Sequence, residues 1–479
     1  MRTTQTPPAA LEGPVDLSGL HGLARESMAW DATETRARLV KGEVSALEVV
    51  EAAIARADLL EPQLGALVYR DDAGARAAAR ANGASGSGSG GVFAGVPTFV
   101  KDMEALRGMP TRYGSQAVPH QVAAASARSV AQLLSTGLVP LGKSTTAEFG
   151  LNATTEPLHG PPTRNPRDRG RSSGGSSGGA SALVAAGVVP IAHAGDGGGS
   201  IRIPAAFCGL VGLKATRGRL APMASASRMP VKIATYGVVT RSVRDTAAFF
   251  AAVDDQRPAG MAAIGHVQGP GRQPLRIGLF IDPPLGTPVD PEVRAATLAA
   301  AAALEAAGHR VLPVAAPYDR QLADDFLTYW GFMAMAVELS VKLQLRGDVA
   351  DLQPWTRALA ARARQSWWAH PGAILRLGRF RHRYAEAFAS CDVMLSPTTA
   401  GPAPRLGELR PDLDHDSLRG RLLELLPYTP AQNASGGPAI SVPFGATRAG
   451  LPIGVQLAAP WGEERRLLEL AYELEAQGK

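Results

Sequence analysis

Apolar positions near the start of the chain recur with helical spacing. Two amphipathic helices are expected over Thr33–Val40 and Ser45–Leu60, and an alanine- and arginine-rich helix over residues 71–82. Ser45 is a favourable N-cap residue, and Glu48 follows three positions later, which is the spacing of a capping box. Residues 1–25 carry no such period and are interpreted as a loose N-terminal arm.

Farther along, short apolar runs typical of buried strands alternate with longer helical patterns. Helices are expected over residues 126–136, 291–307 and 463–475, and a helix end followed by a strand over 183–191. Strands are expected at residues 95–101, 139–142, 211–214, 236–240, 276–281, 311–314, 392–395, 439–442 and 454–457. This alternation predicts an α/β fold whose sheet is buried on both faces.

Two further segments depart from this alternation. Residues 83–91 (GASGSGSGG) are of low complexity and predict a flexible surface loop. From residue 317 to residue 389 the pattern is helical and holds four of the six tryptophans.

One stretch of the sequence has the features of a functional site. Two clusters, Gly174–Gly179 and Gly195–Ser200, combine glycine with serine and flank the small, apolar segment Ala180–Ala192. Glycine reaches backbone conformations that other residues avoid and allows a ligand or another chain to come close. A flexible linker would not need a buried apolar segment between its glycines. We therefore expect two hydroxyl-bearing turns held around a buried segment.

Composition narrows the class of protein. Hydrophobic residues make up 45% of the 479 positions and charged residues 19%, which indicates a globular chain. The net charge of +6 is spread thinly, without a basic run, so no nucleic acid partner is expected. Cys208 and Cys391 are too few for a disulfide framework. With no signal peptide and no membrane-length apolar run, a cytoplasmic protein without a membrane partner is expected, as a monomer or homodimer.

A phosphate-loop pattern also occurs, in the wrong context. Residues 137–144 (GLVPLGKS) match GxxxxGK[ST], but a helix precedes them and the loop itself has the pattern of a strand. Pro140 has no N–H to offer a phosphate. We interpret Lys143 as a structural residue or one at the rim of a site, and we expect neither nucleotide nor metal as a cofactor.

Ser200 is a candidate nucleophile because neighbouring N–H groups of a glycine turn can face a developing oxyanion. A serine nucleophile needs a base. His193, inside the apolar segment, is expected to be a satisfied core histidine. Lys101 ends an apolar strand, where burial could lower its pKa enough for base catalysis, although a lysine at a strand end is more often solvated.

Several motifs together identify the chain by resemblance as a member of the amidase signature family of serine hydrolases. The segments concerned are GVPTFVKD, GGSSGG and DGGGSIRIPAAFCGLVGLK, joined by VKGEVSALEVVEAAIARAD, LGKSTTAEFG, TPAQNASGGPAISVPFG and GLPIGVQL. The resemblance covers nearly the whole chain outside residues 315–390. It implies a single compact domain over residues 26–479, with a large mixed twisted β-sheet covered by helices on both faces.

The resemblance also implies a role for individual residues. Lys101, Ser176 and Ser200 match the catalytic lysine, a relay serine after a cis peptide bond, and the nucleophile. The oxyanion would be bound by the backbone N–H groups of Gly197, Gly198, Gly199 and Ser200. Ser177, Asp196 and Arg202 match residues that brace the two turns, and we expect Asp196 and Arg202 to pair.

This sequence departs from the family pattern at four positions. Gly195 stands where Thr or Ser is usual, Gly197 where many members have Thr or another side chain, and Ser173 where Pro is common. The change at Gly197 makes the loop DGGGS, which is similar to the branch that holds hydrolases of cyclic nylon dimers and urethanes. Ile203 stands where the A subunit of glutamine amidotransferases usually has Gln, which argues against that role.

The substrate is expected in the variable helical region 315–390. Its aromatic residues could line an apolar cleft, although ordinary helix packing is the more common reason for such residues. The expected function is hydrolysis of a hydrophobic amide, anilide or carbamate. A hydrolase of linear or cyclic oligoamides, a partner-dependent amidotransferase subunit and a non-catalytic binding protein remain as alternatives. The candidate pocket residues are Phe326, Trp330, Phe332, Met333, Trp355, Trp367 and Trp368.

Overall fold

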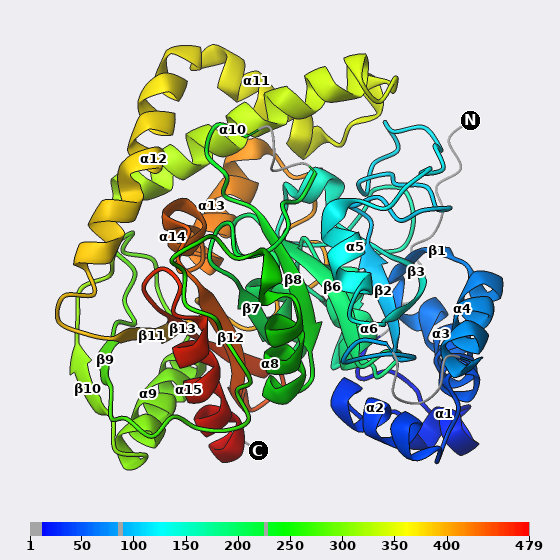
Figure 1. Cartoon of the computed structure of the whole chain (residues 1–479). Coiled ribbons are helices and arrows are strands. Elements are labelled where there is room, and N and C mark those ends of the chain that lie inside the picture. The colour runs from blue at the N-terminus through cyan, green and yellow to red at the C-terminus, as the bar shows by residue number, and fades with distance from the viewer. Residues whose placement is uncertain (1–11, 85–89, 225–228, 479) are drawn as a thin grey trace.

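The centre of the molecule is a mixed sheet of eight strands, flanked by a smaller sheet of three (Figure 1). A computed structural model describes residues 12–84, 90–224 and 229–478. The strand order of the large sheet is β10 (Arg310–Pro313), β9 (Arg276–Leu279), β11 (Val393–Pro397), β13 (Pro452–Ala458), β12 (Ala439–Ala446), β7 (Val211–Lys214), β8 (Thr235–Thr240) and β6 (Ile191–Asp196).

The three-stranded sheet continues from the β6 edge of the large one. Its order is β1 (Leu67–Arg70), β3 (Val139–Ser144) and β2 (Pro97–Lys101), with β2 parallel to β3 and β1 antiparallel to it. In the large sheet β9, β10 and β11 run parallel, and the neighbouring pairs from β11 to β6 are antiparallel. A separate pair is formed by β4 (Arg164–Asn165) and β5 (Asp168–Ser172).

Helices cover both faces of the sheet, as the sequence predicts. Fifteen α-helices are present in the described residues: α1 (Gly22–Glu26), α2 (Ala32–Lys41), α3 (Ala46–Leu64), α4 (Asp72–Ala84), α5 (Arg128–Leu134), α6 (Gly178–Ala185), α7 (Arg202–Cys208), α8 (Val243–Ala252), α9 (Pro291–Ala306), α10 (Arg320–Leu343), α11 (Pro354–Gln365), α12 (His370–Glu386), α13 (His415–Leu425), α14 (Pro430–Ser435) and α15 (Glu464–Gln477).

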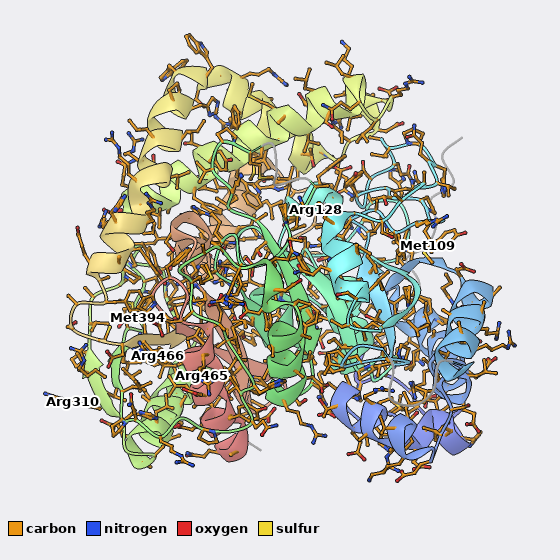
Figure 2. All side chains as sticks on the ribbon, viewed as in Figure 1. Met109, Arg128, Arg310, Met394, Arg465 and Arg466 are labelled. Carbon is orange, nitrogen blue, oxygen red and sulfur yellow. The ribbon has the colours of Figure 1, made fainter. Side chains whose placement is uncertain are left out.

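Two apolar cores lie on the two sides of the sheet because side chains alternate along each strand. On β6, Ile191 belongs to the core that includes α8, α9 and α15, whereas Ala192 and Ala194 belong to the core built with α3, α6 and α7. Buried side chains fill the space between sheet and helices. Figure 2 shows the contrast with the rim: Met394 on β11 lies inside, and Arg310 on the edge strand β10 extends outward.

The helices α10, α11 and α12 form a layer above the sheet, at the top of Figure 1. They correspond to the region in which the sequence predicts helices, and α13 and α14 lie beneath them. Across the described residues, no helix is both long and apolar enough to span a bilayer.

Local sequence signals set many boundaries correctly. Ser45 and Glu48 form the predicted capping box of α3, and β7 spans the predicted residues. The sequence did not predict α7, α8, α13 or α14. Part of the predicted arm is attached to the rest of the chain, because the Val15 N–H donates to the Pro166 carbonyl and α1 begins at Gly22. Most of the predicted loop 83–91 lies outside the described residues.

Candidate active site

Lys101 is the last residue of β2, and its side chain is fully enclosed. Its Nζ lies 2.7 Å from Ser176 Oγ, 2.9 Å from Ser177 Oγ and 3.4 Å from the Gly195 carbonyl oxygen. The strand-end lysine is therefore buried and in contact with both serines of the first glycine turn.

Burial decides the protonation of Lys101. Removal from water disfavours the ammonium form and lowers the pKa of Lys101 to about 7, although the negative charges of Asp196 and Glu104 act in the opposite direction. A lysine with this pKa exists in both forms near neutral pH, so it can accept a proton and later return it.

Ser176 lies in the turn that leads into α6, after a cis peptide bond between Gly175 and Ser176. The turn is pressed against α7, the helix that follows Ser200. Gly174 has a φ of 82°, and a Cβ at this position would lie 2.8 Å from the Cα of Pro204. A side chain here is therefore excluded both by backbone conformation and by space, which allows the first glycine turn to pack directly against α7.

Ser200 lies in the second turn, is almost fully buried and borders a cavity. Within the described chain, the N–H groups of Gly197, Gly198 and Ser200 have no hydrogen-bond acceptor. The N–H of Gly199 differs, because it donates to Asp196 Oδ1 over 2.7 Å. Of the four N–H groups assigned to the oxyanion from the sequence, that of Gly199 is thus used to shape the turn in this structure.

Asp196 and Arg202 form the expected ion pair, fully buried, with Arg202 Nε 3.0 Å from Asp196 Oδ2. The Arg202 guanidinium outweighs the effect of burial and lowers the pKa of Asp196 to about 2. Asp196 Oδ2 also accepts the N–H of Ile201, over 3.2 Å. One ionised carboxylate thus holds the backbone on both sides of Ser200.

A second set of residues braces this turn from the C-terminal part of the chain. Asn433 donates to Asp196 Oδ1 and accepts from Arg202, while Gln432 and Gln456 accept from the same guanidinium. Thr429 Oγ1 donates to the Gly198 carbonyl over 2.7 Å. Sequence reasoning assigned no role to these residues. They are more than 220 positions from the turn, and their only signal was the resemblance of the segments 429–445 and 450–457.

Two other candidates from the sequence also lie near Lys101. Lys143 is buried on β3 and pairs with Asp102 over 2.8 Å, which agrees with a structural role. His193 is buried as expected, and its Nδ1 accepts the main-chain N–H of Lys101 over 3.3 Å. The expectation that it is fully satisfied is wrong, because Nε2 has no partner in the described structure.

The cavity beside Ser200 has a volume of about 120 Å³ and lies below α10. Of the seven predicted pocket residues, Phe326, Trp330 and Trp355 border it. The other four do not. Met333 is packed in an apolar core, Phe332 stacks on Tyr329, and Trp367 and Trp368 are about two-thirds exposed. A tryptophan-rich helix pattern could not distinguish these positions, because only the path of α10–α12 decides which rings turn inward.

The cavity wall is almost wholly apolar. Both indole N–H groups, of Trp330 and Trp355, donate to the carbonyl of Leu151, over 3.1 Å and 2.8 Å. These bonds fix the two rings and leave their faces and edges for contact with a ligand. No charged side chain borders the cavity, which is lined by Leu151, Asn152, Ala153, Gly198, Ser200, Ile203, Leu285, Tyr318, Leu322, Ala323, Phe326, Leu327, Trp330, Trp355, Leu422, Leu423, Leu426, Pro427, Pro430 and Ala431.

The described residues include no group of three or more His, Cys, Asp or Glu side chains placed to hold a metal ion. The site offers a buried amine, three hydroxyl groups and main-chain N–H groups that have no acceptor in the described chain, next to an uncharged cavity.

Known proteins match this chain in sequence and fold over nearly its full length. The family model described as Amidase matches residues 48–468. A putative amidase, AmiC, of Mycobacterium leprae (strain TN) is 43% identical over 91% of this chain and 92% of its own. The solved structure of 6-aminohexanoate cyclic dimer hydrolase covers 94% of this chain and 97% of its own, with a TM-score of 0.84 and 32% identity.

A further solved structure is that of a bacterial aryl acylamidase belonging to the amidase signature enzymes. It covers 94% of this chain and 96% of its own, with a TM-score of 0.81 and 27% identity. Family model, sequence and fold thus agree across the segments that carry Lys101, Ser176 and Ser200, and the chain belongs to the amidase signature family of hydrolases.

Proposed function

We propose that this protein hydrolyses uncharged amides, anilides or carbamates that carry a hydrophobic group, through an acyl-enzyme on Ser200. The observation that carries the proposal is the 2.7 Å contact between Lys101 Nζ and Ser176 Oγ in a site closed to solvent. A neutral amine at this distance can take the serine proton directly.

The proposed reaction begins with attack of Ser200 Oγ on the substrate carbonyl carbon. The Ser200 proton passes to Ser176, whose own proton passes to neutral Lys101. The tetrahedral intermediate collapses as the carbon–nitrogen bond breaks, and the proton returns through Ser176 to the leaving nitrogen. Water then attacks the acyl ester with the same relay, releasing the acid and restoring Ser200.

The negative charge of the tetrahedral intermediate needs donors that are already in place. The free N–H groups of Gly197, Gly198 and Ser200 supply them in this proposal. The bond from Gly199 to Asp196 contributes indirectly, because it fixes the turn in which the other three donors lie. Ser177 holds Lys101 in place from the side, over 2.9 Å.

The cavity supports a small, uncharged and hydrophobic substrate group. An apolar cavity of roughly 150 Å³ can bind benzene, so 120 Å³ has room for about one ring or a short alkyl chain. A charged group would be costly there, because no side chain of opposite charge borders the cavity. The fold shared with an aryl acylamidase is consistent with an anilide.

Hydrolysis of a cyclic oligoamide is the second candidate. Its support is the similarity to 6-aminohexanoate cyclic dimer hydrolase together with the uncharged cavity wall, since a cyclic oligoamide has no charged ends. A linear oligoamide would place a carboxylate or an ammonium group at the site. An amidotransferase subunit is disfavoured by Ile203, an apolar residue that borders the cavity.

The test is turnover by the purified chain without a partner or ATP. The panel contains acetyl, hexanoyl and benzoyl anilides, a succinyl anilide that carries a carboxylate, an aryl carbamate, the cyclic 6-aminohexanoate dimer and glutamine. We expect the neutral anilides to be cleaved and the succinyl anilide to be cleaved at least about tenfold more slowly, the cost of roughly 1.4 kcal/mol for burying its charge. Failure of every neutral substrate would contradict the proposal.

Serine variants identify the nucleophile. Ser200→Ala should abolish turnover and labelling by a fluorophosphonate. Ser181→Ala is a matched control, because Ser181 is also buried, on α6, but its hydroxyl has no hydrogen-bond partner in the described structure. Turnover that persists in Ser200→Ala, or is lost equally in Ser181→Ala, would show that Ser200 is not the nucleophile.

A further inference from the structure

The strands β2 and β6 lie side by side, yet they belong to different sheets (Figure 1). β2 pairs with β3, and β6 pairs with β8, so no ladder joins β2 to β6 in the described chain. Side chains bridge the two strands instead. Thr98 Oγ1 donates to the Ile191 carbonyl over 2.9 Å, and Lys101 Nζ lies 3.4 Å from the Gly195 carbonyl.

Ser177 occupies the end of this gap. Its hydroxyl donates to the Gly195 carbonyl over 3.2 Å and accepts the Gly195 N–H over 3.3 Å. One hydroxyl thus satisfies both main-chain groups that a neighbouring strand would satisfy. Strands in a ladder are about 4.8 Å apart, which leaves no room for a hydroxyl between them. A hydroxyl thus stands where a ladder hydrogen bond to Gly195 would be, and the Lys101 amine contacts that hydroxyl over 2.9 Å.

His193 lies between Ile191 and Gly195 at the same edge. The Lys101 N–H donates to the imidazole Nδ1 rather than to a carbonyl of β6. The ring thus stands in for the β6 carbonyl that would accept the Lys101 N–H in a ladder, and it acts as a spacer between the two strands. It is held from the other side by stacking on Tyr236, with the ring centres 5.5 Å apart.

The hydrogen bond from the Lys101 N–H fixes the tautomer of the His193 ring. Because Nδ1 accepts a hydrogen bond, the proton of the neutral ring is on Nε2, which has no partner in the described structure. Burial first, then the charges of Lys101 and Lys143, lower the pKa of His193 to about 3, so the ring stays neutral at working pH. A buried N–H without a partner costs about 1–3 kcal/mol, so His193 is a poor choice for core packing alone.

We propose that His193 is a positioning residue that places the proposed base Lys101, by accepting its main-chain N–H and holding β2 apart from β6. This inference rests on the proposed role of Lys101. Without the acceptor, the end of β2 would shift toward β6, and the amine would leave its short contact with Ser176. A displacement of about 1 Å in a catalytic group can cost roughly a hundredfold in rate.

Two substitutions distinguish the effect of the hydrogen-bond acceptor at position 193 from the effect of the side-chain volume. His193→Asn places Oδ1 near the position of Nδ1 and keeps the acceptor, whereas His193→Leu keeps an apolar side chain without it. In His193→Leu, we expect kcat per titrated Ser200 site to fall roughly 10- to 100-fold, while KM changes less than about twofold. In His193→Asn, we expect kcat to stay within about threefold of the wild-type value. Sites are counted by exhaustive fluorophosphonate labelling.

Thr98→Val is the matched control. It removes another side-chain bond across the same gap, with nearly unchanged shape, but does not touch Lys101. We expect a lower melting temperature and an unchanged kcat. A kcat in His193→Leu within twofold of wild type would overturn the inference. So would equal losses in His193→Asn and His193→Leu, or a loss in Thr98→Val as large as in His193→Leu.

The proposed function is tested separately by Lys101→Met in the same assay. High activity in Lys101→Met would show that Lys101 is not the base, and the inference about His193 would then be wrong as well. An inactive Lys101→Met together with a fully active His193→Leu would overturn only the role of His193.

Discussion

The main-chain N–H of Gly199 donates to the Asp196 carboxylate over 2.7 Å, inside the turn that carries Ser200. Asp196 is in turn neutralised by Arg202, so a buried ion pair determines the direction of the peptide groups around the serine. The turn therefore depends on a definite set of contacts as well as on the flexibility of glycine.

The first prediction concerns Gly199→Ala. Gly199 has a φ of +127°, and an added Cβ would lie 2.3 Å from Thr429 Oγ1 and 2.6 Å from Ile203 Cδ1. Because both backbone and neighbours exclude it, we expect activity to be lost and the melting temperature to fall. Gly197→Ala is the control: its nearest neighbour would be 3.7 Å away, so its melting temperature should be unchanged. Wild-type turnover by Gly199→Ala would contradict this account of the turn.

The second prediction is a pH dependence. The pKa of Lys101 is lowered by burial to about 7, and only the neutral amine can accept a proton. As the pH falls below 7 the amine becomes charged, so kcat/KM for a neutral anilide should decrease, to about one-hundredth of its plateau at pH 5. A steady-state profile from pH 5 to pH 9 measures this, and a flat profile would rule out a lysine base.

A second buried lysine provides the control for that profile. Burial also lowers the pKa of Lys214 to about 7, but its Nζ donates only to the Ala215 carbonyl among the described residues. Lys214→Met should keep the same acid limb. If the limb disappears in Lys214→Met, the titrating group is Lys214 rather than Lys101.

The third prediction concerns Arg202→Met. This change leaves the Asp196 carboxylate buried without its cation, which costs about 3–5 kcal/mol of the free energy of unfolding. Urea titration measures the loss. Arg362→Met is the matched control, since Arg362 and Asp416 form a solvent-exposed pair whose loss should barely change the free energy of unfolding. An equal loss of unfolding free energy in the two variants would show that the buried pair stabilises the protein no more than an exposed pair does.

The fourth prediction separates cavity residues from surface residues. Phe326 borders the cavity and lies close to Gly198, so Phe326→Ala removes apolar contact with the substrate. We expect KM for a benzoyl anilide to rise roughly tenfold, the equivalent of about 1.4 kcal/mol of lost burial. Trp367→Ala should leave KM unchanged because Trp367 is exposed. A larger effect in Trp367→Ala than in Phe326→Ala would place the substrate elsewhere.

Features set by neighbouring residues could be predicted from the sequence. The capping box at Ser45 depends on Glu48, three positions away, and the two glycine turns depend on residues that follow one another. Lys101 was a candidate from its strand-end position, but only the resemblance favoured it over an ordinary solvated lysine, because nothing near it in the sequence shows that its strand end is enclosed. Its burial depends on Ser176, Ser177 and Gly195, which are 75 to 94 positions away.

The sequence by itself determined the α/β alternation, the serine-bearing turns and, through the family motifs, the three residues of the candidate site. Only the tertiary structure decided that the Gly199 N–H donates to Asp196 and that His193 accepts the main-chain N–H of Lys101. It also decided that Trp355 borders the cavity whereas Trp367 is exposed to solvent. The physical reason is that a hydrogen-bond donor or an aromatic ring has no fixed role of its own. Its role depends on which distant segment folds against it, and that is a property of the whole chain.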